Sequence, residues 1–193
     1  MRSTARLLAA IALLGACAGD PTATDASADL ASTTDAALRA GPSPEQRGLA
    51  AARAATARFH RYDVADDAGY TFLFMDMCMT DGSPANAGGM GYHYVNTQLL
   101  DGAVDVATPE AVLYEPEANG KRRLVAVEYV IPAAAWTSAT PPELFGQPFT
   151  LNAFDLWALH VWLWKDNPSG LYADWNPRVS CDNAPASTAM AHH

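Results

Sequence analysis

Two short apolar runs on either side of Asn119-Gly120 constrain the fold more than any other feature of the sequence. The runs are "AVLYEP" at residues 111–116 and "RRLVAVEYVIP" at residues 122–132, and Gly or Pro bounds them. Asn-Gly between two such runs is a strong hairpin signal, because both residues tolerate the positive φ that a tight turn requires. We therefore expect residues 111–116 and 122–132 to be adjacent antiparallel strands.

Three further segments have the composition of strands. They are "YTFLFMDMCM" from Tyr70, "YHYVN" at residues 92–96, and "WALHVWLW" at residues 157–164. Aromatic and β-branched residues, which favour strands, are frequent in all three. The stretch at residues 133–153 is rich in Pro, Ala and Thr, and we expect an irregular loop there.

A single helix is expected ahead of these strands. Ser43 and Gln46 form a capping-box pattern, and Pro44 stands in the first helical turn, where proline is tolerated. An Ala-rich stretch follows to about Asp66, and Gly69 ends it. The expected fold class is α+β, with one N-terminal helix of about 20 residues packed on a curved antiparallel β-sheet.

Four polar side chains lie inside the apolar strands and are the candidate site residues: His93, Glu115, Glu128 and His160. A carboxylate or imidazole in the middle of an apolar strand is unusual, because burying it without a partner costs free energy or shifts its pKa. Each of the four therefore calls for a partner or a ligand.

Period-two alternation predicts which neighbours share a face with these residues. Glu128 is expected on the same face as Ala126 and Leu124. His160 is expected on the same face as Trp162 and Trp164.

Two histidines and two carboxylates are a sensible ligand set for a divalent transition metal such as zinc, copper, iron or manganese. The same groups suit acid–base catalysis in a hydrolase or isomerase, with His93 or His160 against Glu128. They also suit a buried polar network with only a structural role. No HxH, HExxH or CxxC motif is present, so the choice depends on whether the side chains converge.

A third class of function is that of a structural factor of the cell envelope. It predicts an exposed apolar patch around Phe154 and Trp157 and no converging polar site.

Three glycines crowd His93 in "GGMGYHYVN" at residues 88–96. The segment is not a phosphate-binding loop, because it lacks the lysine and the strand–loop–helix frame. We expect the glycines to permit positive φ or a close approach of another backbone.

The N-terminus indicates the compartment. Arg2 and Arg6 precede an apolar run that is too short to span a bilayer, which reads as a secretory signal. The run ends in Leu14-Gly15-Ala16-Cys17, which resembles a bacterial lipobox, so residues 1–16 are the expected lipoprotein signal peptide and Cys17 the acylated residue. The alternative is an ordinary signal peptide with an incidental cysteine. Ala18 after the cysteine favours the outer membrane.

The remaining boundaries follow from composition. Residues 17–42 are the expected lipidated cysteine and disordered tether, since Ala, Thr, Ser, Asp, Gly and Pro cannot bury enough apolar area to order a chain. Residues 43–183 are the expected single domain, and residues 184–193 a flexible tail.

The chain has three cysteines, and acylation of Cys17 leaves Cys78 and Cys181. In an oxidising periplasm such a pair is expected to close into a disulfide. Two free buried thiols are the alternative.

Charge excludes one class of partner. The formal net charge is −9, and Lys121-Arg122-Arg123 is the one basic cluster. Nucleic-acid binding needs many cations to displace counterions from phosphates, so we expect no nucleic-acid partner. The expected partners are the membrane, through the lipid anchor, and a metal or small ligand.

Several motifs together resemble a family of uncharacterised secreted bacterial proteins and lipoproteins. They include "GGMGYHYVN", "LYEP", "VAVEYVIP" and "LHVWLWKDNPSGLYADWNPRVSC", and the resemblance covers residues 46–181. Cys78 and Cys181 correspond to the two characteristic cysteines of that family. The resemblance supplies no catalytic residues. Relatives often carry a longer, histidine-containing loop before the "LHVW" strand, and this chain lacks that histidine.

Overall fold

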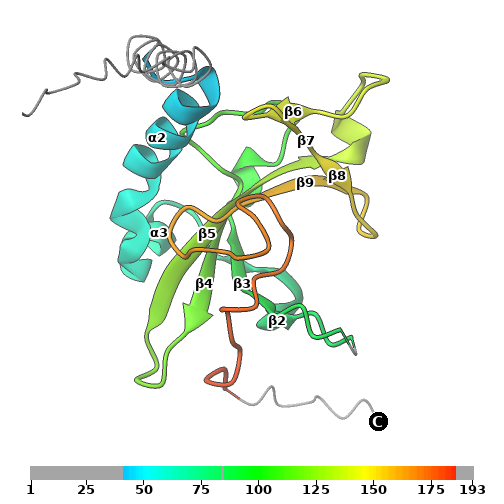
Figure 1. Cartoon of the computed structure of the whole chain (residues 1–193). Helices are drawn as coiled ribbons and strands as arrows, with labels where there is room; N and C mark the ends of the chain where they lie inside the picture. The colour runs from blue at the N-terminus through cyan, green and yellow to red at the C-terminus, as the bar shows by residue number, and fades with distance from the viewer. Residues whose placement is uncertain (1–40, 84, 186–193) are drawn as a thin grey trace, which may run out of the picture. The chain divides into compact units, whose positions relative to one another are not determined.

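The structure is a computed structural model that describes residues 41–83 and 85–185 (Figure 1). The expected signal peptide, Cys17 and most of the expected tether and tail lie outside the described residues. The described residues from Pro42 onward belong to one compact unit. No helix within the described residues is both long and apolar enough to cross a membrane.

The capping box at the start of the helix is confirmed. In α2 (Pro44–Thr56), the Gln46 amide donates to Ser43 Oγ at 3.1 Å, and the Ser43 amide donates to Gln46 Oε1 at 2.8 Å. The reciprocal pair satisfies two of the amide donors that a helix start leaves without intrahelical partners.

The expected continuous helix of about 20 residues is wrong, because the chain breaks into α2, the 3₁₀ turn η1 (Ala57–His60) and α3 (Tyr62–Asp67). Arg61 between them is extended, with φ −94° and ψ 111°. The Thr56 hydroxyl donates back to Ala52 O at 2.8 Å, a contact that tends to bend helices. The break leaves Phe59 O free to accept from Tyr114 Oη of the sheet at 2.6 Å.

The sheet contains seven strands, and every neighbouring pair is antiparallel. Its main path runs β1-β3-β4-β5-β9-β8, and β2 pairs with β3. The strand bounds are β1 Phe72–Leu73, β2 Met79–Thr80, β3 Gly89–Val95, β4 Ala111–Pro116, β5 Arg122–Pro132, β8 Thr150–Leu151 and β9 Leu156–Val161. With the helix that precedes the strands, the fold class is α+β as expected.

The central hairpin is confirmed, since β4 and β5 have the predicted bounds and pair antiparallel. The alternation along β5 is not as predicted. Leu113 faces Ala126 while Tyr114 faces Leu124, so Val125 is an extra residue in a β-bulge. The bulge turns Leu124 to the opposite face from Ala126 and Glu128.

The stretch at residues 133–153 is less irregular than expected. It contains the two-stranded hairpin of β6 (Glu143–Leu144) and β7 (Gln147–Pro148), and then β8, which extends the main sheet beside β9. The Asn152 side chain accepts from the amides of Phe154 and Leu156 at 3.0 and 3.2 Å and so fixes the β8–β9 turn. Strands of two residues are too short to produce an alternating pattern.

The two faces of the sheet bury different elements. On one face, Ala52, Phe59 and Ala65 of the helical segment pack with residues of the sheet such as Tyr114 and Tyr129. On the other face, Val179 and Trp162 of the C-terminal segment pack on Ala111, Leu113 and Val125. Figure 1 shows α2 and α3 beside the sheet and the orange-to-red C-terminal segment running across it.

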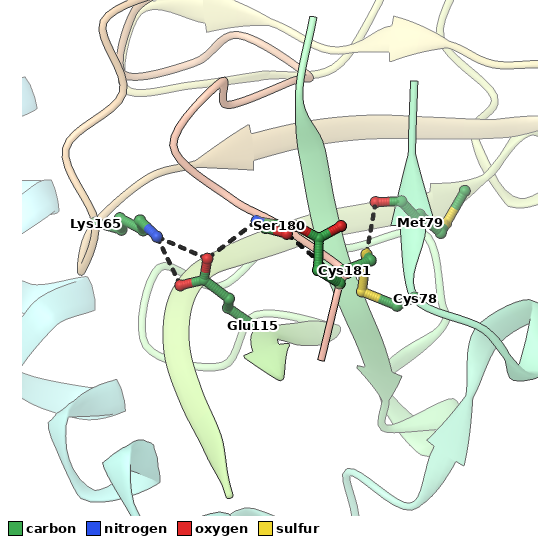
Figure 2. The surroundings of a disulfide bond; sticks show 7 residues. Cys78, Met79, Glu115, Lys165, Ser180 and Cys181 are labelled. Atoms are coloured by element: carbon green, nitrogen blue, oxygen red, sulfur yellow. Dashed lines mark hydrogen bonds and ion pairs between the residues drawn. A yellow bond between two sulfur atoms is a disulfide. The ribbon is translucent and has the colours of Figure 1, made fainter. Parts of the chain in front are cut away.

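The expected disulfide is confirmed. Cys78 and Cys181 are bonded across a sequence separation of 103 residues, next to β2 (Figure 2). The bond ties the C-terminal segment to the edge of the sheet.

Candidate metal centre

His93 lies in the middle of β3, opposite Leu113 of β4. Its neighbours Tyr92 and Tyr94 pack toward the helical segment. His93 therefore points to the other face of the sheet, and it is only 3% exposed.

Glu128 and His160 face each other directly across β5 and β9. Opposite residues in an antiparallel pair share a face, and Glu128 is also opposite Ala111, which belongs to the face that carries His93. The sheet register alone therefore brings three of the four predicted residues together on one face.

The ligand-capable atoms of these three side chains lie within 4.8 Å of one another. The Nε2 atoms of His93 and His160 are 3.3 Å apart. Glu128 Oε1 is 3.4 Å from His160 Nε2, and Glu128 Oε2 is 3.7 Å from His93 Nε2. Three lone-pair-bearing atoms thus surround one point.

The separation of the two Nε2 atoms matches one edge of a tetrahedral metal site. Zn–N bonds of about 2.0–2.1 Å place two ligands of a tetrahedron roughly 3.3–3.4 Å apart, whereas adjacent ligands of an octahedron lie roughly 3.0 Å apart. The Nε2–Nε2 distance of 3.3 Å and the 3.4 Å distance from His160 Nε2 to Glu128 Oε1 are at the tetrahedral value, and the 3.7 Å distance from His93 Nε2 is to the other oxygen of Glu128.

Burial and nearby carboxylates give the two histidines different protonation behaviour. Burial lowers the pKa of His93 to about 4, although Glu128 acts in the opposite direction. Burial also acts to lower the pKa of His160, but Glu128 and Asp174 together outweigh it and raise that pKa above its ordinary value. His93 is thus neutral at physiological pH, and a metal at His160 would compete with the proton for that ring.

The ring nitrogens on the far side of the cluster are poorly satisfied. Nδ1 of His93 and Nδ1 of His160 are buried and have no hydrogen-bond partner among the described residues. A buried network with only a structural role is expected to satisfy such atoms. A metal-bound histidine also normally donates through its other ring nitrogen, so the Nδ1 atoms favour neither interpretation.

Asp174 is a site residue that the sequence analysis missed. Its Oδ1 lies 3.6 Å from His160 Nδ1, on the side of the ring away from the cluster. The neighbouring His160 lowers the pKa of Asp174. Asp174 lies outside the strands, in "LYADWNPRVSC", and no local sequence pattern distinguishes it. Because a metal-bound histidine commonly pairs with a carboxylate through its other ring nitrogen, a search for such a carboxylate could have found it.

Glu115, predicted as a fourth candidate ligand, does not join the cluster. It is opposite Arg123, whereas Ala111, four residues earlier on β4, is opposite Glu128, which separates the two carboxylates by roughly 13 Å along the strands. Lys165 Nζ donates to both Glu115 oxygens at 2.8 and 2.6 Å, and the Ser180 amide donates at 3.0 Å (Figure 2). Glu115 holds the C-terminal segment near the disulfide.

Trp164 also departs from expectation. β9 ends at Val161, and the amides of Trp164 and Lys165 then bond to Val125 O at the bulge. Trp164 consequently packs on the helical side, with its ring 4.5 Å from that of His60.

The glycines before His93 serve the backbone, as expected. Gly91 has φ +91°, and a Cβ there would lie 2.5 Å from Tyr114 O of the adjacent strand. A Cβ on Gly88, with φ +108°, would lie 2.1 Å from Asn176 O. Both close approaches hold β3 in the position that delivers His93 to the site.

A cavity of about 410 Å³ adjoins the three ligand atoms. His93, Glu128, His160 and Asp174 line it, together with a larger number of apolar residues. Cavities of this size accommodate small ligands. Comparison with family models, curated proteins and solved structures finds no match for this chain.

Proposed function

We propose that this protein binds one divalent transition metal, zinc in preference to the others, through His93, Glu128 and His160. The observation that carries the proposal is the convergence of three buried side chains whose ligand atoms lie within 4.8 Å of one another, with two of the separations close to tetrahedral edges. Two neutral imidazoles and one carboxylate also leave a compact charge of +1 at the metal, which suits burial better than an isolated dication.

The fourth coordination position would face the cavity. Structural zinc sites are closed by four protein ligands, whereas sites that act on a ligand keep one position open. Only three protein ligands converge among the described residues, and the cavity adjoins them. The proposal is therefore a binding protein whose metal takes part in holding a small ligand.

A metal-dependent enzyme is the second candidate, and the open position favours it. The cavity lining offers little further acid–base chemistry, because Asp174 is its one titratable residue besides the three ligands within the described part of the chain. Metal-free catalysis by a His–Glu pair is less well supported, since the 3.4 and 3.7 Å separations exceed hydrogen-bond length.

Elemental analysis of the purified, untagged mature chain tests the metal proposal. The background carries His192→Ala and His193→Ala, because terminal imidazoles can bind metal loosely. We expect about one zinc per chain, lost in His93→Ala and in His160→Ala. His60→Ala, which removes an exposed imidazole from the helical segment, is the matched control and should retain it. A native protein that holds well below one metal ion per chain would overturn the proposal.

We also propose that Cys17 carries a lipid that anchors the protein in the periplasm, most plausibly at the outer membrane. The disulfide supports an oxidising compartment. Mass spectrometry of the native N-terminus and membrane fractionation of Cys17→Ser test this proposal. An unacylated native protein in the soluble fraction would overturn it.

A further inference from the structure

The cavity beside the three ligand atoms has one polar end and an otherwise apolar lining. Its apolar lining includes Phe74, Met79, Met90 and Trp175. The polar end is formed by the His93–Glu128–His160 cluster and Asp174. Apolar walls of this kind favour a ligand whose body is itself apolar.

Other polar groups in the lining are few. Thr150 and Asn152 are present, but the Asn152 amide oxygen already accepts two backbone amides in the β8–β9 turn. No lysine or arginine lines the cavity in the described part of the chain. An anionic group in the cavity would therefore have to be neutralised at the metal.

Exposed aromatic side chains stand at the same cavity. Phe72 is 51% exposed and Phe154 is 49% exposed, and both contribute to the lining. The ring of Phe74 lies 5.1 Å from that of Phe154 and 6.5 Å from that of His93. The three side chains thus connect the solvent-exposed edge of the cavity with the polar cluster by apolar surface.

We infer that the ligand is an apolar chain or ring that carries a single anionic oxygen donor, such as a carboxylate. The inference rests on the proposed zinc site. The donor takes the open position of the metal, where Zn²⁺ with one glutamate leaves a charge of +1 for it to neutralise. The apolar body fills the cavity between Phe74, Met90 and Trp175.

A chain-length series tests the apolar part of this inference. Acetate, hexanoate and decanoate are titrated into the zinc-loaded mature chain by calorimetry, with zinc content measured on the same samples. Each methylene that enters the cavity should strengthen binding roughly fourfold, so decanoate, with four more methylenes, should bind about 250-fold more tightly than hexanoate. Zinc-loaded protein that binds decanoate no better than acetate would overturn the inference and leave the metal site standing.

Removal of zinc by a chelator tests the placement of the anionic group. Without the metal, Glu128 and Asp174 repel a carboxylate, and no lysine or arginine of the lining offsets this repulsion within the described residues, so decanoate affinity should fall at least tenfold. Equal affinity with and without zinc would overturn the placement. If the mature chain holds no zinc at all, the elemental analysis reports failure of the metal site itself, separately from the chain-length result.

Ala158→Phe places a ring in the cavity, because Ala158 lines it two residues before His160 on the same strand. This variant should keep its zinc and lose decanoate binding at least tenfold. Leu151→Ala is the matched control, since Leu151 is exposed on the adjacent β8 and outside the lining. Loss of decanoate binding in both variants, or in neither, would contradict the inference.

Discussion

Asp174 is not one of the three proposed ligands, but we expect it to affect how strongly they bind a metal. Its carboxylate lies 3.6 Å from His160 Nδ1 and favours the ring orientation that would direct Nε2 to the proposed metal. Losing such a partner typically weakens metal binding by about 10–100-fold, and we expect Asp174→Asn to do so in competition with a chromophoric zinc chelator. Asp182→Asn makes the same change of charge at an exposed position in the same segment. Unchanged affinity in Asp174→Asn, or an equal loss in both variants, would refute this role.

Glu110 is a buried carboxylate that is not one of the proposed ligands. We expect its ionisation to make the free energy of unfolding depend on pH. It is 3% exposed, accepts from the Val130 amide at 2.8 Å, and burial raises its pKa to about 7. The pKa of Glu110 is higher in the folded state than in the unfolded state. The free energy of unfolding is therefore greatest below the unfolded-state pKa, and it declines as the pH rises from there toward 7.

Glu110→Gln keeps the acceptor and removes the charge, so the variant should gain about 2–3 kcal/mol over the native protein at pH 8 and little at pH 4. Urea unfolding at both pH values measures the difference. Glu143→Gln, at an exposed position, should show no such gain. A pH-independent difference between Glu110→Gln and the native protein would rule out this assignment.

At the scale of the element, strand β3 depends on glycine for its approach to β4. A Cβ on Gly91 would lie 2.5 Å from Tyr114 O, whereas Gly120 has a similar positive φ of +76° with nothing within 4 Å. Gly120→Ala should therefore cost about 1–2 kcal/mol for its backbone conformation alone. Gly91→Ala should cost about 3 kcal/mol or more and weaken zinc binding, because β3 must shift. Equal losses of unfolding free energy in Gly91→Ala and Gly120→Ala, measured in urea, would show that β3 and β4 accommodate the added Cβ easily.

The elements that the sequence predicts well are those with strong local signals. Asn119-Gly120 and its flanking runs predict β4 and β5 with the bounds that the structure has, and Ser43 with Gln46 predicts the helix start. The break at Arg61 and the bulge at Val125 could not be predicted, because contacts with distant segments stabilise them: Tyr114 Oη at Phe59 O, and two backbone amides at Val125 O.

The site residues also divide into those that local sequence patterns predict and those that depend on contacts with distant segments. Residue type within apolar strands was enough to select His93, Glu128 and His160, and their convergence required only the order and register of the sheet. The same criterion wrongly included Glu115, whose partner Lys165 is 50 residues away in the sequence. Asp174 lies in an irregular segment, so its proximity to His160 depends on the whole molecule.

At the scale of the whole molecule, the Cys78–Cys181 bond joins the edge of the sheet to the end of the C-terminal segment. On the chain-entropy model, closing a loop of this length removes about 4–5 kcal/mol of denatured-state entropy. We expect the Cys78→Ala/Cys181→Ala double variant to lose about that much stability in urea, and reduction of the native protein to match it. A loss below about 1 kcal/mol would mean that the reduced chain retains the closure by other contacts.

The central claim is that one metal ion lies on one face of the sheet, held by side chains of β3, β5 and β9. Anomalous scattering at the zinc edge from crystals of the mature chain tests this claim most directly. The account predicts a single strong peak about 2.0–2.2 Å from His93 Nε2, His160 Nε2 and a Glu128 oxygen. Crystals grown with zinc that show no peak there, with the two imidazoles hydrogen-bonded to each other instead, would contradict it.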